Sequence, residues 1–267
     1  MDFDRVSALL SSRSPVYVTG FPELPSTNDH LNRMARGGAP EWTVVAADAQ
    51  TKGKGRQQRF WHSAPGVGLW FSILLRPKMA PRFLNLVNLQ ATLTLAEYLE
   101  SACATADDAP LKLDLKWPND IWHKGRKVCG MLLEGKFEGM RLGHLVLGVG
   151  LNVNHTAADF PEELRETAGS LRIATGKEQD REALLAGFLE RFYANFPRRL
   201  ETEGDAIVER YLKRVLFRGQ RVAVDTRKGR RTGVFDGITG DGFLILDVDG
   251  DLEHIAAGDV FPLPTEG

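Results

Sequence analysis

The sequence predicts an α+β protein, in which a large domain of mixed strands and helices is followed by a small β domain. Up to residue 216, runs of β-branched and aromatic residues bounded by glycine or charge alternate with stretches of helical periodicity. From residue 217 onward, short β-type runs separated by glycine turns replace them. A chain of 267 residues can form two such units, because domains usually span about 100–200 residues. We therefore expect domains over residues 1–216 and 217–267.

Two predicted strands flank a basic loop near the amino-terminal third of the chain. Thr43–Asp48 and Leu69–Leu75 are rich in Val, Ile, Phe and Trp and end at glycine or charge, as strands do. Between them lies the loop Gly53-Lys54-Gly55-Arg56-Gln57-Gln58-Arg59-Phe60-Trp61. We expect the strands to support this loop at both ends.

The next element is a predicted helix over Leu84–Leu99. Leu86, Leu89, Leu93 and Ala96 recur at helical spacing, and no Gly or Pro interrupts the segment. Its apolar stripe is expected to pack on the sheet.

Three further strands are predicted over Lys112–Trp117, Val128–Glu138 and His144–Val153. Lys124–Arg126 marks a tight turn between the first two, because it contains a glycine between charged residues. Lys116 is therefore expected at a strand end beside a hairpin.

Two helices should complete the large domain, over Arg181–Phe196 and Asp205–Phe217. They are separated near Pro197, since an interior proline removes a backbone donor and clashes with the preceding turn. The small domain then reads as a β-barrel. Its predicted strands are Gln220–Asp225, Thr232–Phe235, Phe243–Asp247 and His254–Ala256.

Composition excludes several classes of protein. A net charge of −1 argues against nucleic-acid binding by bulk electrostatics, which needs a basic surplus across a domain. Cys103 and Cys129 are the only cysteines, and neither belongs to a CxxC pair or a zinc-type spacing. The amino terminus lacks a secretory signal, and no segment reaches the roughly 18 apolar residues of a membrane span. We expect a soluble cytoplasmic protein that binds neither DNA nor a membrane.

The basic loop suggests binding of an anion. It lacks the G-x-x-x-x-G-K-[ST] pattern of a P-loop. Its glycines allow backbone N–H groups to approach an anion, an arginine fork can hold phosphate or carboxylate oxygens, and Trp61 can stack on a base. By itself, such a loop is more often a solvated surface turn. Gly148-Val149-Gly150 is likewise no Rossmann fingerprint, because valine occupies the position of the third glycine.

A second cationic site lies in Leu115-Lys116-Trp117-Pro118-Asn119-Asp120. A strand-end lysine is usually a surface residue. Here the proline fixes the turn, and Asn119 and Asp120 can hydrogen-bond its backbone, so we interpret both as structural. Two cationic sites in one fold indicate chemistry on anions.

Leu24–Asp29 precedes a helix-like stretch and allows two interpretations. Its Ser, Thr, Asn and Asp residues are common helix caps, and they can also hydrogen-bond a small polar ligand. Glu134 and Asp114 lie on strand patterns, where we favour internally satisfied carboxylates over magnesium contacts. The remaining candidates, His62, His144 and His155, have no partner at metal-ligand spacing.

Five motifs follow one another along the chain: Ser26-Thr27-Asn28; Gln50 with the loop Gly53–Trp61; Lys116-Trp117-Pro118-Asn119-Asp120; Lys127-Val128-Cys129-Gly130-Met131-Leu132-Leu133-Glu134; and Gly148-Val149-Gly150-Leu151-Asn152-Val153-Asn154. In this order they resemble the signature set of biotin protein ligases. The resemblance covers about half of the chain, from Ser26 to Asn154, and extends more loosely to an SH3-like carboxyl-terminal domain.

The resemblance implies a mixed sheet with flanking helices, related to class II aminoacyl-tRNA synthetases, plus a small SH3-like β-barrel. It also implies a ligase that uses ATP and Mg²⁺ to activate biotin as biotinyl-5'-AMP. The biotinyl group then passes to a lysine of a biotin carboxyl carrier protein. A monomer or a homodimer is compatible with it.

The resemblance assigns roles to residues at matching positions. Lys116 and Arg56 are implied as the catalytic pair that contacts the biotin carboxylate and the adenylate. The magnesium ligands stay open. Biotin binding is implied for Ser26, Thr27, Asn28, Gln50, Lys54, Gly55, Arg56 and Lys116, and ATP binding for Arg56, Arg59, Trp61 and Asn152.

Two departures from the family pattern lie in the loop. Lys54 replaces the common arginine, which keeps the charge but loses the guanidinium fork, and Gln58 replaces the common glycine. Only 25 residues precede Ser26, too few for the winged helix-turn-helix that many members carry, so we expect a form without the DNA-binding domain. Lipoate ligation and a non-catalytic biotin sensor remain alternatives to biotin ligation.

Overall fold

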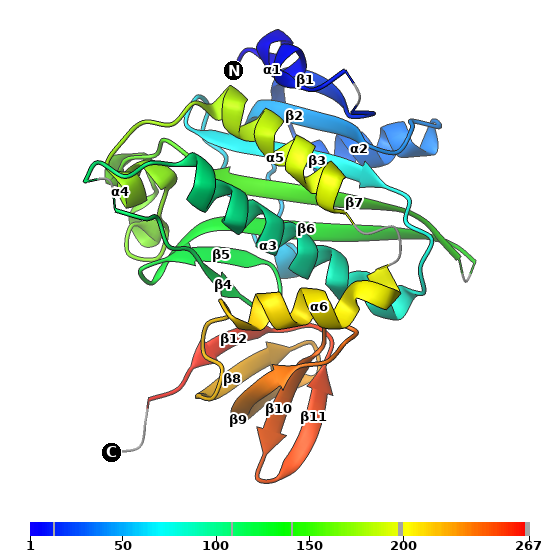
Figure 1. Cartoon of the computed structure of the whole chain (residues 1–267), viewed down its shortest axis with the longest axis vertical. Helices are drawn as coiled ribbons and strands as arrows, with labels where there is room; N and C mark the ends of the chain where they lie inside the picture. The colour runs from blue at the N-terminus through cyan, green and yellow to red at the C-terminus, as the bar shows by residue number, and fades with distance from the viewer. Residues whose placement is uncertain (13, 108, 140, 197–199, 265–267) are drawn as a thin grey trace.

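A seven-stranded mixed sheet forms the large part of the computed structural model (Figure 1), which describes residues 1–12, 14–107, 109–139, 141–196 and 200–264. The strand order is β1-β2-β3-β7-β6-β5-β4. β1 and β2 run parallel, and every other neighbouring pair is antiparallel. The strands are β1 (Tyr17–Leu24), β2 (Thr43–Gln50), β3 (Gly68–Leu75), β4 (Asp114–Lys116), β5 (Asp120–His123), β6 (Arg126–Glu138) and β7 (Arg141–Asn152).

Helices cover both faces of this sheet. α3 packs against β4, β5 and β6, α5 packs against β3, and α1 and α6 lie against α5 and α3. On the opposite face, α2 packs against β2, β3 and β7. The helices are α1 (Phe3–Leu9), α2 (Thr27–Arg36), α3 (Leu84–Ala102), α4 (Leu171–Thr175), α5 (Arg181–Asn195) and α6 (Leu200–Leu212).

Side chains that alternate between the two faces of the sheet divide the buried residues into two clusters. Ile73 and Leu147 belong to the large cluster beneath α3 and α5. Leu74 and Val146, their neighbours in sequence, belong with Leu31 of α2 to a smaller cluster. Successive side chains of a strand point to opposite faces, so β3 and β7 are buried on both sides. The small cluster leaves part of the α2 face free for a site.

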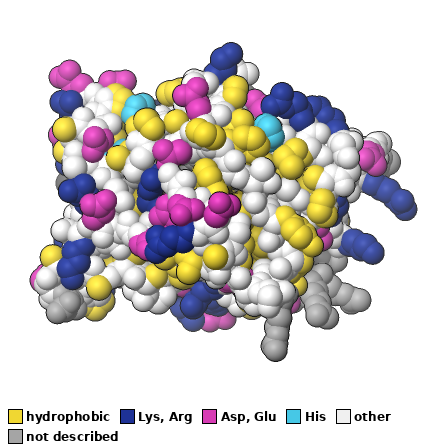
Figure 2. Space-filling view, turned by 90° about the horizontal axis from the view of Figure 1, so that it is seen from above, with side chains coloured by type: hydrophobic (Ala, Val, Ile, Leu, Met, Phe, Trp, Pro, Cys, Tyr) yellow, Lys and Arg dark blue, Asp and Glu magenta, His cyan; other side chains and the backbone are white. Residues whose placement is uncertain are grey.

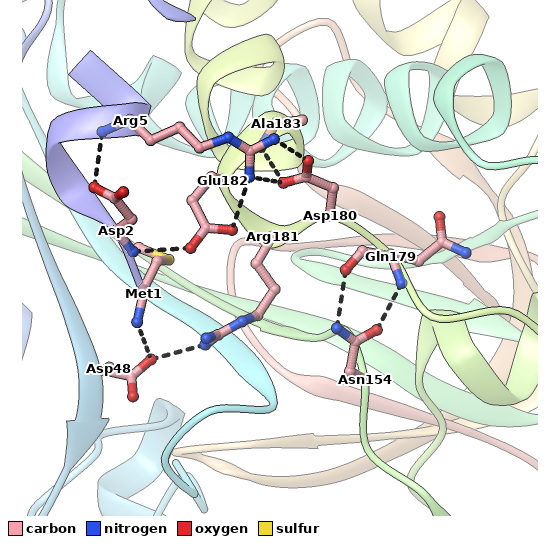
Figure 3. Close-up of polar contacts among 10 residues, drawn as sticks. All are labelled: Met1, Asp2, Arg5, Asp48, Asn154, Gln179, Asp180, Arg181, Glu182 and Ala183. Carbon is pink, nitrogen blue, oxygen red and sulfur yellow. Dashed lines mark hydrogen bonds and ion pairs between the residues drawn. The ribbon is translucent and has the colours of Figure 1, made fainter. Parts of the chain in front are cut away.

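A polar cluster fastens the start of α5 to the end of β2 (Figure 3). Asp48 of β2 accepts hydrogen bonds from Arg181 at 2.8 Å and from the amino group of Met1 at 3.3 Å. Nearby, the Asn154 amide donates to the Gln179 carbonyl and accepts from the Gln179 N–H, each at 2.9 Å. The contacts join four segments that are distant in the sequence.

Charge at the end of the molecule near α1 is mixed. Figure 2 shows basic and acidic side chains interspersed on this face, with apolar side chains between them. Neither sign forms a continuous patch there.

The small domain is a five-stranded antiparallel sheet in the order β11-β10-β9-β8-β12. It touches the large domain through α6, which packs on β9, and through Trp117, whose indole N–H donates to the Gly242 carbonyl at 3.1 Å. Its strands are β8 (Arg221–Thr226), β9 (Gly229–Ile238), β10 (Leu244–Val248), β11 (Asp251–Ile255) and β12 (Asp259–Pro262). The predicted β domain is confirmed, and closure of its sheet into a barrel stays a prediction.

The predicted helix over Asp205–Phe217 is wrong at both ends, because α6 spans Leu200–Leu212. After α6 the backbone turns and pairs with β4: the Leu115 N–H donates to Arg214, and Leu115 accepts from Leu216. Tertiary pairing thus ends the helix early. The predicted break at Pro197 lies outside the described residues. β1, β5 and β12 were not expected, whereas the predicted strands and the helices over Leu84–Leu99 and Arg181–Phe196 are confirmed within a few residues.

Candidate active site

A cavity of about 450 Å³ opens beside α2, between the large sheet, the basic loop and the small domain. Ligand sites commonly enclose about 300–1,000 Å³, so this volume suits a small molecule. The lining includes every site residue predicted from the sequence: Ser26, Thr27, Asn28, Gln50, Lys54, Gly55, Arg56, Arg59, Trp61, Lys116 and Asn152.

Glycines form the floor of this cavity on β6 and β7. Gly130 and Gly150 pair across the two strands, and Gly148 lies two residues along β7. A Cβ atom on Gly150 would lie 2.4 Å from the Trp61 ring, and one on Gly148 would lie 2.2 Å from Asn28 Oδ1. Trp61 and Asn28 can therefore lie against the strand backbone only because these two positions are glycine. The glycines of the motif Gly148-Val149-Gly150 thus leave room for the side chains of Asn28 and Trp61.

The start of α2 supplies a network of neutral polar groups. Ser26 caps the helix, since its hydroxyl accepts from the Asp29 N–H at 3.4 Å. The Gln50 side-chain carbonyl accepts from the Thr27 N–H at 2.8 Å and from the Thr27 hydroxyl at 3.1 Å. The Gln50 amide in turn donates to the Ser63 hydroxyl at 3.0 Å. The interpretation as a helix cap is confirmed. Hydrogen bonding to a ligand stays a prediction, for which Ser26, Thr27 and Asn28 are placed in the lining of the cavity.

Asn28 is fixed by neighbours on two strands, β3 and β6. Its Oδ1 accepts from the Ser72 hydroxyl at 2.6 Å, and its amide donates to Glu134 at 2.8 Å and to the Leu132 carbonyl at 3.4 Å. Glu134 also accepts from Asn32 at 3.5 Å, in accord with the interpretation of Glu134 as an internally satisfied carboxylate. The amide plane of Asn28 is thus set before any ligand arrives.

The basic loop is tied to the small domain through its arginines. Arg56 donates to the Asn119 side chain at 2.8 Å and to the Gly258 carbonyl at 3.1 Å, and it lies 3.3 Å from Asp259. Arg59 pairs with the same carboxylate at 2.7 Å. Burial lowers the pKa of Arg56, and the charge of Asp259 opposes this shift. Two loop cations therefore converge on one carboxylate of β12.

Lys54 and Gln58, the two departures from the family pattern, have different structural consequences. The Lys54 ammonium pairs with Asp29 of α2 at 2.5 Å, in a largely exposed position. Gln58 has a φ of 63°, in the left-handed region that costs a residue with a Cβ roughly 1–2 kcal/mol. Glycine would occupy this conformation without that cost, so the loop of this chain carries some strain.

Two lysines face the cavity from its cationic side. Lys116 ends β4, and its ammonium lies between the rings of Trp122 and Phe261. Lys127 of β6 pairs with Asp120 at 2.8 Å and lies 5.1 Å from the Trp61 ring centroid. Burial lowers the pKa of Lys116, and the nearby Asp120 opposes that shift.

Asn152 contacts the backbone of a neighbouring segment. Its amide donates to the Gly169 carbonyl at 2.9 Å, just beyond Thr167 and Ala168, which line the cavity. In the same wall, Phe160 stacks on His155 with centroids 4.7 Å apart. His155 is fully buried, and burial lowers its pKa to about 4, so this ring is neutral at physiological pH.

Several residues of the site were not singled out from the sequence. Asn119 and Asp120 were interpreted as structural, yet both line the cavity, where Asn119 binds Arg56 and Asp120 binds Lys127. Lys127 is the first residue of the motif Lys127–Glu134. Its place in that motif could have identified it as a residue of the site. Other lining residues to which the sequence assigned no role include Trp122, Asp259 and Phe261.

The cavity therefore offers two kinds of chemistry. One end has neutral donors and acceptors around α2, and the other has the cations of the loop, β4 and β6. Such a site suits a ligand with a polar uncharged head and an anionic tail. Across the described part of the chain, no three His, Cys, Asp or Glu side chains gather as a metal site would require. No helix in that part is long and apolar enough to cross a membrane.

The chain is similar to known proteins along most of its length. Residues 20–152 match the biotin/lipoate A/B protein ligase family, and residues 217–261 match the biotin protein ligase C-terminal domain. The chain is 34% identical over 240 residues to the bifunctional ligase/repressor BirA of Bacillus subtilis (strain 168), covering 89% of this chain and 71% of that protein. It is 30% identical over 242 residues to a biotin–acetyl-CoA-carboxylase ligase of Paracoccus denitrificans, covering 88% and 96%.

A solved structure supports the same relationship. The biotin protein ligase from Aquifex aeolicus in complex with biotin and ATP superposes with a TM-score of 0.74 at 30% identity, covering 92% of this chain and 97% of that chain. Two family matches, these relatives and this fold agree. The chain therefore belongs to the biotin protein ligase family.

Proposed function

We propose that this protein activates biotin with ATP as biotinyl-5'-AMP and transfers the biotinyl group to a lysine of a biotin carboxyl carrier domain. The observation that carries the proposal is the convergence of all the sequence-predicted site residues on one cavity of about 450 Å³. Relatives that are named for biotin and acetyl-CoA carboxylase support the same substrate and acceptor.

The polar network at the start of α2 is the proposed site for the head of biotin. A ureido ring presents N–H donors and a carbonyl acceptor, which neutral hydroxyls and amides can match without a charge. Ser26 and Thr27 are almost fully buried, so a hydrogen bond to them excludes water. Gln50 and Asn28 hold the network in one orientation through the contacts described above.

The cationic end is the proposed site of activation. A carboxylate oxygen of biotin attacks the α-phosphorus of ATP, the bond from that phosphorus to the bridging oxygen breaks, and pyrophosphate leaves with the electron pair. Two anions must approach each other in this step, so fixed positive charge stabilises the transition state. Lys116 and Arg56 are the proposed catalytic residues. Lys127, which lines the same cavity, is a further candidate.

Transfer completes the reaction. The neutral amine of the acceptor lysine attacks the acyl carbon of biotinyl-5'-AMP, an amide bond forms, and AMP leaves. An acyl-adenylate hydrolyses in water, so closure of the basic loop protects it until the acceptor arrives. Lys54, Gly55 and Arg56 are proposed to close over biotin, and Arg59, Trp61 and Asn152 to face ATP.

Magnesium enters this proposal with ATP. Mg²⁺ usually keeps several waters and binds through phosphates with one or two carboxylates. The cavity carboxylates Asp120 and Asp259 already pair with Lys127 and with the loop arginines. These donors suit a metal carried in by the triphosphate better than one held by protein ligands alone.

We also propose that the chain divides into a catalytic domain over residues 1–216 and a small domain over residues 217–267. The first strand of the small sheet begins at Arg221, shortly after this boundary. The linker before it pairs with β4, so the two domains meet next to Lys116.

Labelled biotin, MgATP and a purified biotin carboxyl carrier domain test the proposal directly. We expect label on a single lysine of the acceptor, and none on a variant in which that lysine is replaced by arginine. Lipoate in excess should not reduce the labelling. Absence of transfer, with biotin and MgATP saturating, would contradict the proposal, and effective competition by lipoate would favour a lipoate ligase.

A further inference from the structure

We propose that Phe261, a residue of the small domain, is a positioning residue for Lys116. Together with Trp122 it forms an aromatic clamp that holds the lysine ammonium in the cavity and leaves its charge unneutralised. The inference rests on the proposed function, because it assumes that Lys116 binds an anionic substrate.

The clamp is assembled from both domains. The Lys116 ammonium lies 4.7 Å from the Phe261 ring centroid and 4.8 Å from the Trp122 ring centroid. Trp122 comes from β5, which pairs with the β4 strand that carries Lys116. Phe261 comes from β12, which pairs with β8 of the small sheet. Both distances are within the roughly 6 Å at which a cation is attracted to a ring face.

The carboxylates near Lys116 are occupied by other cations. Asp120 pairs with Lys127 at 2.8 Å, and Asp259 pairs with Arg59 at 2.7 Å and Arg56 at 3.3 Å. In the described ranges, Lys116 itself has no carboxylate oxygen within 4.0 Å. A carboxylate partner would compete with a phosphate or a biotin carboxylate for the ammonium. Aromatic faces hold the cation but carry no net charge, so its N–H donors remain available to an anion.

The orientation of Phe261 supports a role in the site over a role in the small-domain core. Its neighbour Val260 is buried in that core, whereas Phe261 points the other way and lines the cavity. Phe261 is 37% exposed, so the core of the small domain does not enclose its ring. The ring is therefore available to contact the lysine.

The variants Phe261→Leu and Phe261→Tyr distinguish a cation–π contact with Lys116 from apolar packing alone. Leucine retains an apolar side chain without a π face, and tyrosine retains the face. The readout is biotin-dependent pyrophosphate release from MgATP. We expect Phe261→Leu to lower kcat about fivefold with the KM for biotin unchanged, because a cation–π contact contributes about 0.5–1 kcal/mol or more. Phe261→Tyr should restore kcat to within about twofold of the wild type.

Two controls complete the test. Phe137→Leu makes the same change at an exposed ring of β6 outside the cavity, and it should leave kcat unchanged. In a Lys116→Ala background, Phe261→Leu should have no additional effect, since residues that act as one unit are not additive.

Normal kcat for Phe261→Leu, failure of tyrosine to rescue, or a full additional effect without Lys116 would each overturn the inference. These outcomes require an active wild type. A wild type that releases no pyrophosphate would instead contradict the proposed function itself.

Discussion

At the scale of single residues, Lys116 is the centre of the account. Its position at a strand end contributes little to the core, yet it faces the cavity between two rings. Lys116→Ala should therefore reduce biotin-dependent pyrophosphate release by about 100-fold or more, the cost of losing one preorganised group that stabilises transition-state charge. The unfolding midpoint should change little.

Lys112→Ala is the matched control, because it removes an exposed lysine just before the same strand. Its rate should equal that of the wild type. A folded Lys116→Ala protein that releases pyrophosphate at the normal rate would show that another group, with Lys127 the first candidate, performs the activation.

At the scale of elements, the basic loop is held in place by β12. Asp259→Asn keeps the shape of the side chain and removes the charge that holds Arg56 and Arg59. We expect trypsin to cleave the ligand-free loop about three to ten times faster, since partly exposed ion pairs contribute about 0.2–1 kcal/mol each. Biotin with MgATP should restore protection, because phosphates can replace the lost carboxylate on the arginines.

Glu253→Gln offers a control in the same sheet, since that carboxylate pairs with Arg231 and lies on β11, at the opposite edge of the sheet from β12. Cleavage sites are identified by mass spectrometry of the fragments. Equal loop cleavage rates in the two variants would mean that Asp259 does not restrain the loop.

A second element-scale prediction concerns the cluster between β2 and α5. Burial raises the pKa of Asp48, but Arg181 and the amino group of Met1 outweigh this and lower it below its ordinary value of 3.8. The ionised carboxylate therefore stabilises the fold at neutral pH, and this contribution is lost as the pH falls through the lowered pKa. Asp48→Asn should reduce the free energy of unfolding at pH 7 by about 1–3 kcal/mol.

Urea unfolding at pH 7 and at decreasing pH measures this effect. The difference between Asp48→Asn and the wild type should shrink as the pH falls below 3.8. Asp236→Asn, at an exposed position of β9, should match the wild type throughout. A difference for Asp48→Asn that is independent of pH would rule out the ion pairs as its cause.

At the scale of the whole molecule, the small domain completes the active site. β12 supplies Asp259 to the loop and Phe261 to Lys116, and the linker after α6 pairs with β4. The cavity is thus enclosed by both domains. This arrangement couples any movement of the small domain to the loop and to Lys116.

Much of the large domain could be predicted from the sequence, because its strands and helices follow clear periodicities. Leu84–Leu99 and the strands around the loop are examples. Eleven of the residues that line the cavity could also be predicted, since their motifs have a specific order. Their hydrogen-bond partners could not, because Asn28 with Ser72 and Arg56 with Asn119 are contacts between distant segments.

The strand β12 shows most clearly why the rest could not be predicted. Asp259–Pro262 is only four residues long and ends in proline, and its buried valine is followed by two exposed residues, so it lacks a clear alternation. Short edge strands give a weak local signal. The function of Asp259 and Phe261 depends on residues about 140 to 200 positions earlier in the chain, which no local pattern records.

The central claim is that one cavity joins biotin to ATP. Its most direct test is a single turnover of the purified protein with biotin and MgATP in the absence of acceptor, followed by mass spectrometry of the bound product. The account predicts pyrophosphate release that requires biotin, with biotinyl-5'-AMP retained by the protein. Release of pyrophosphate without biotin, or no adenylate at saturating substrates, would contradict it.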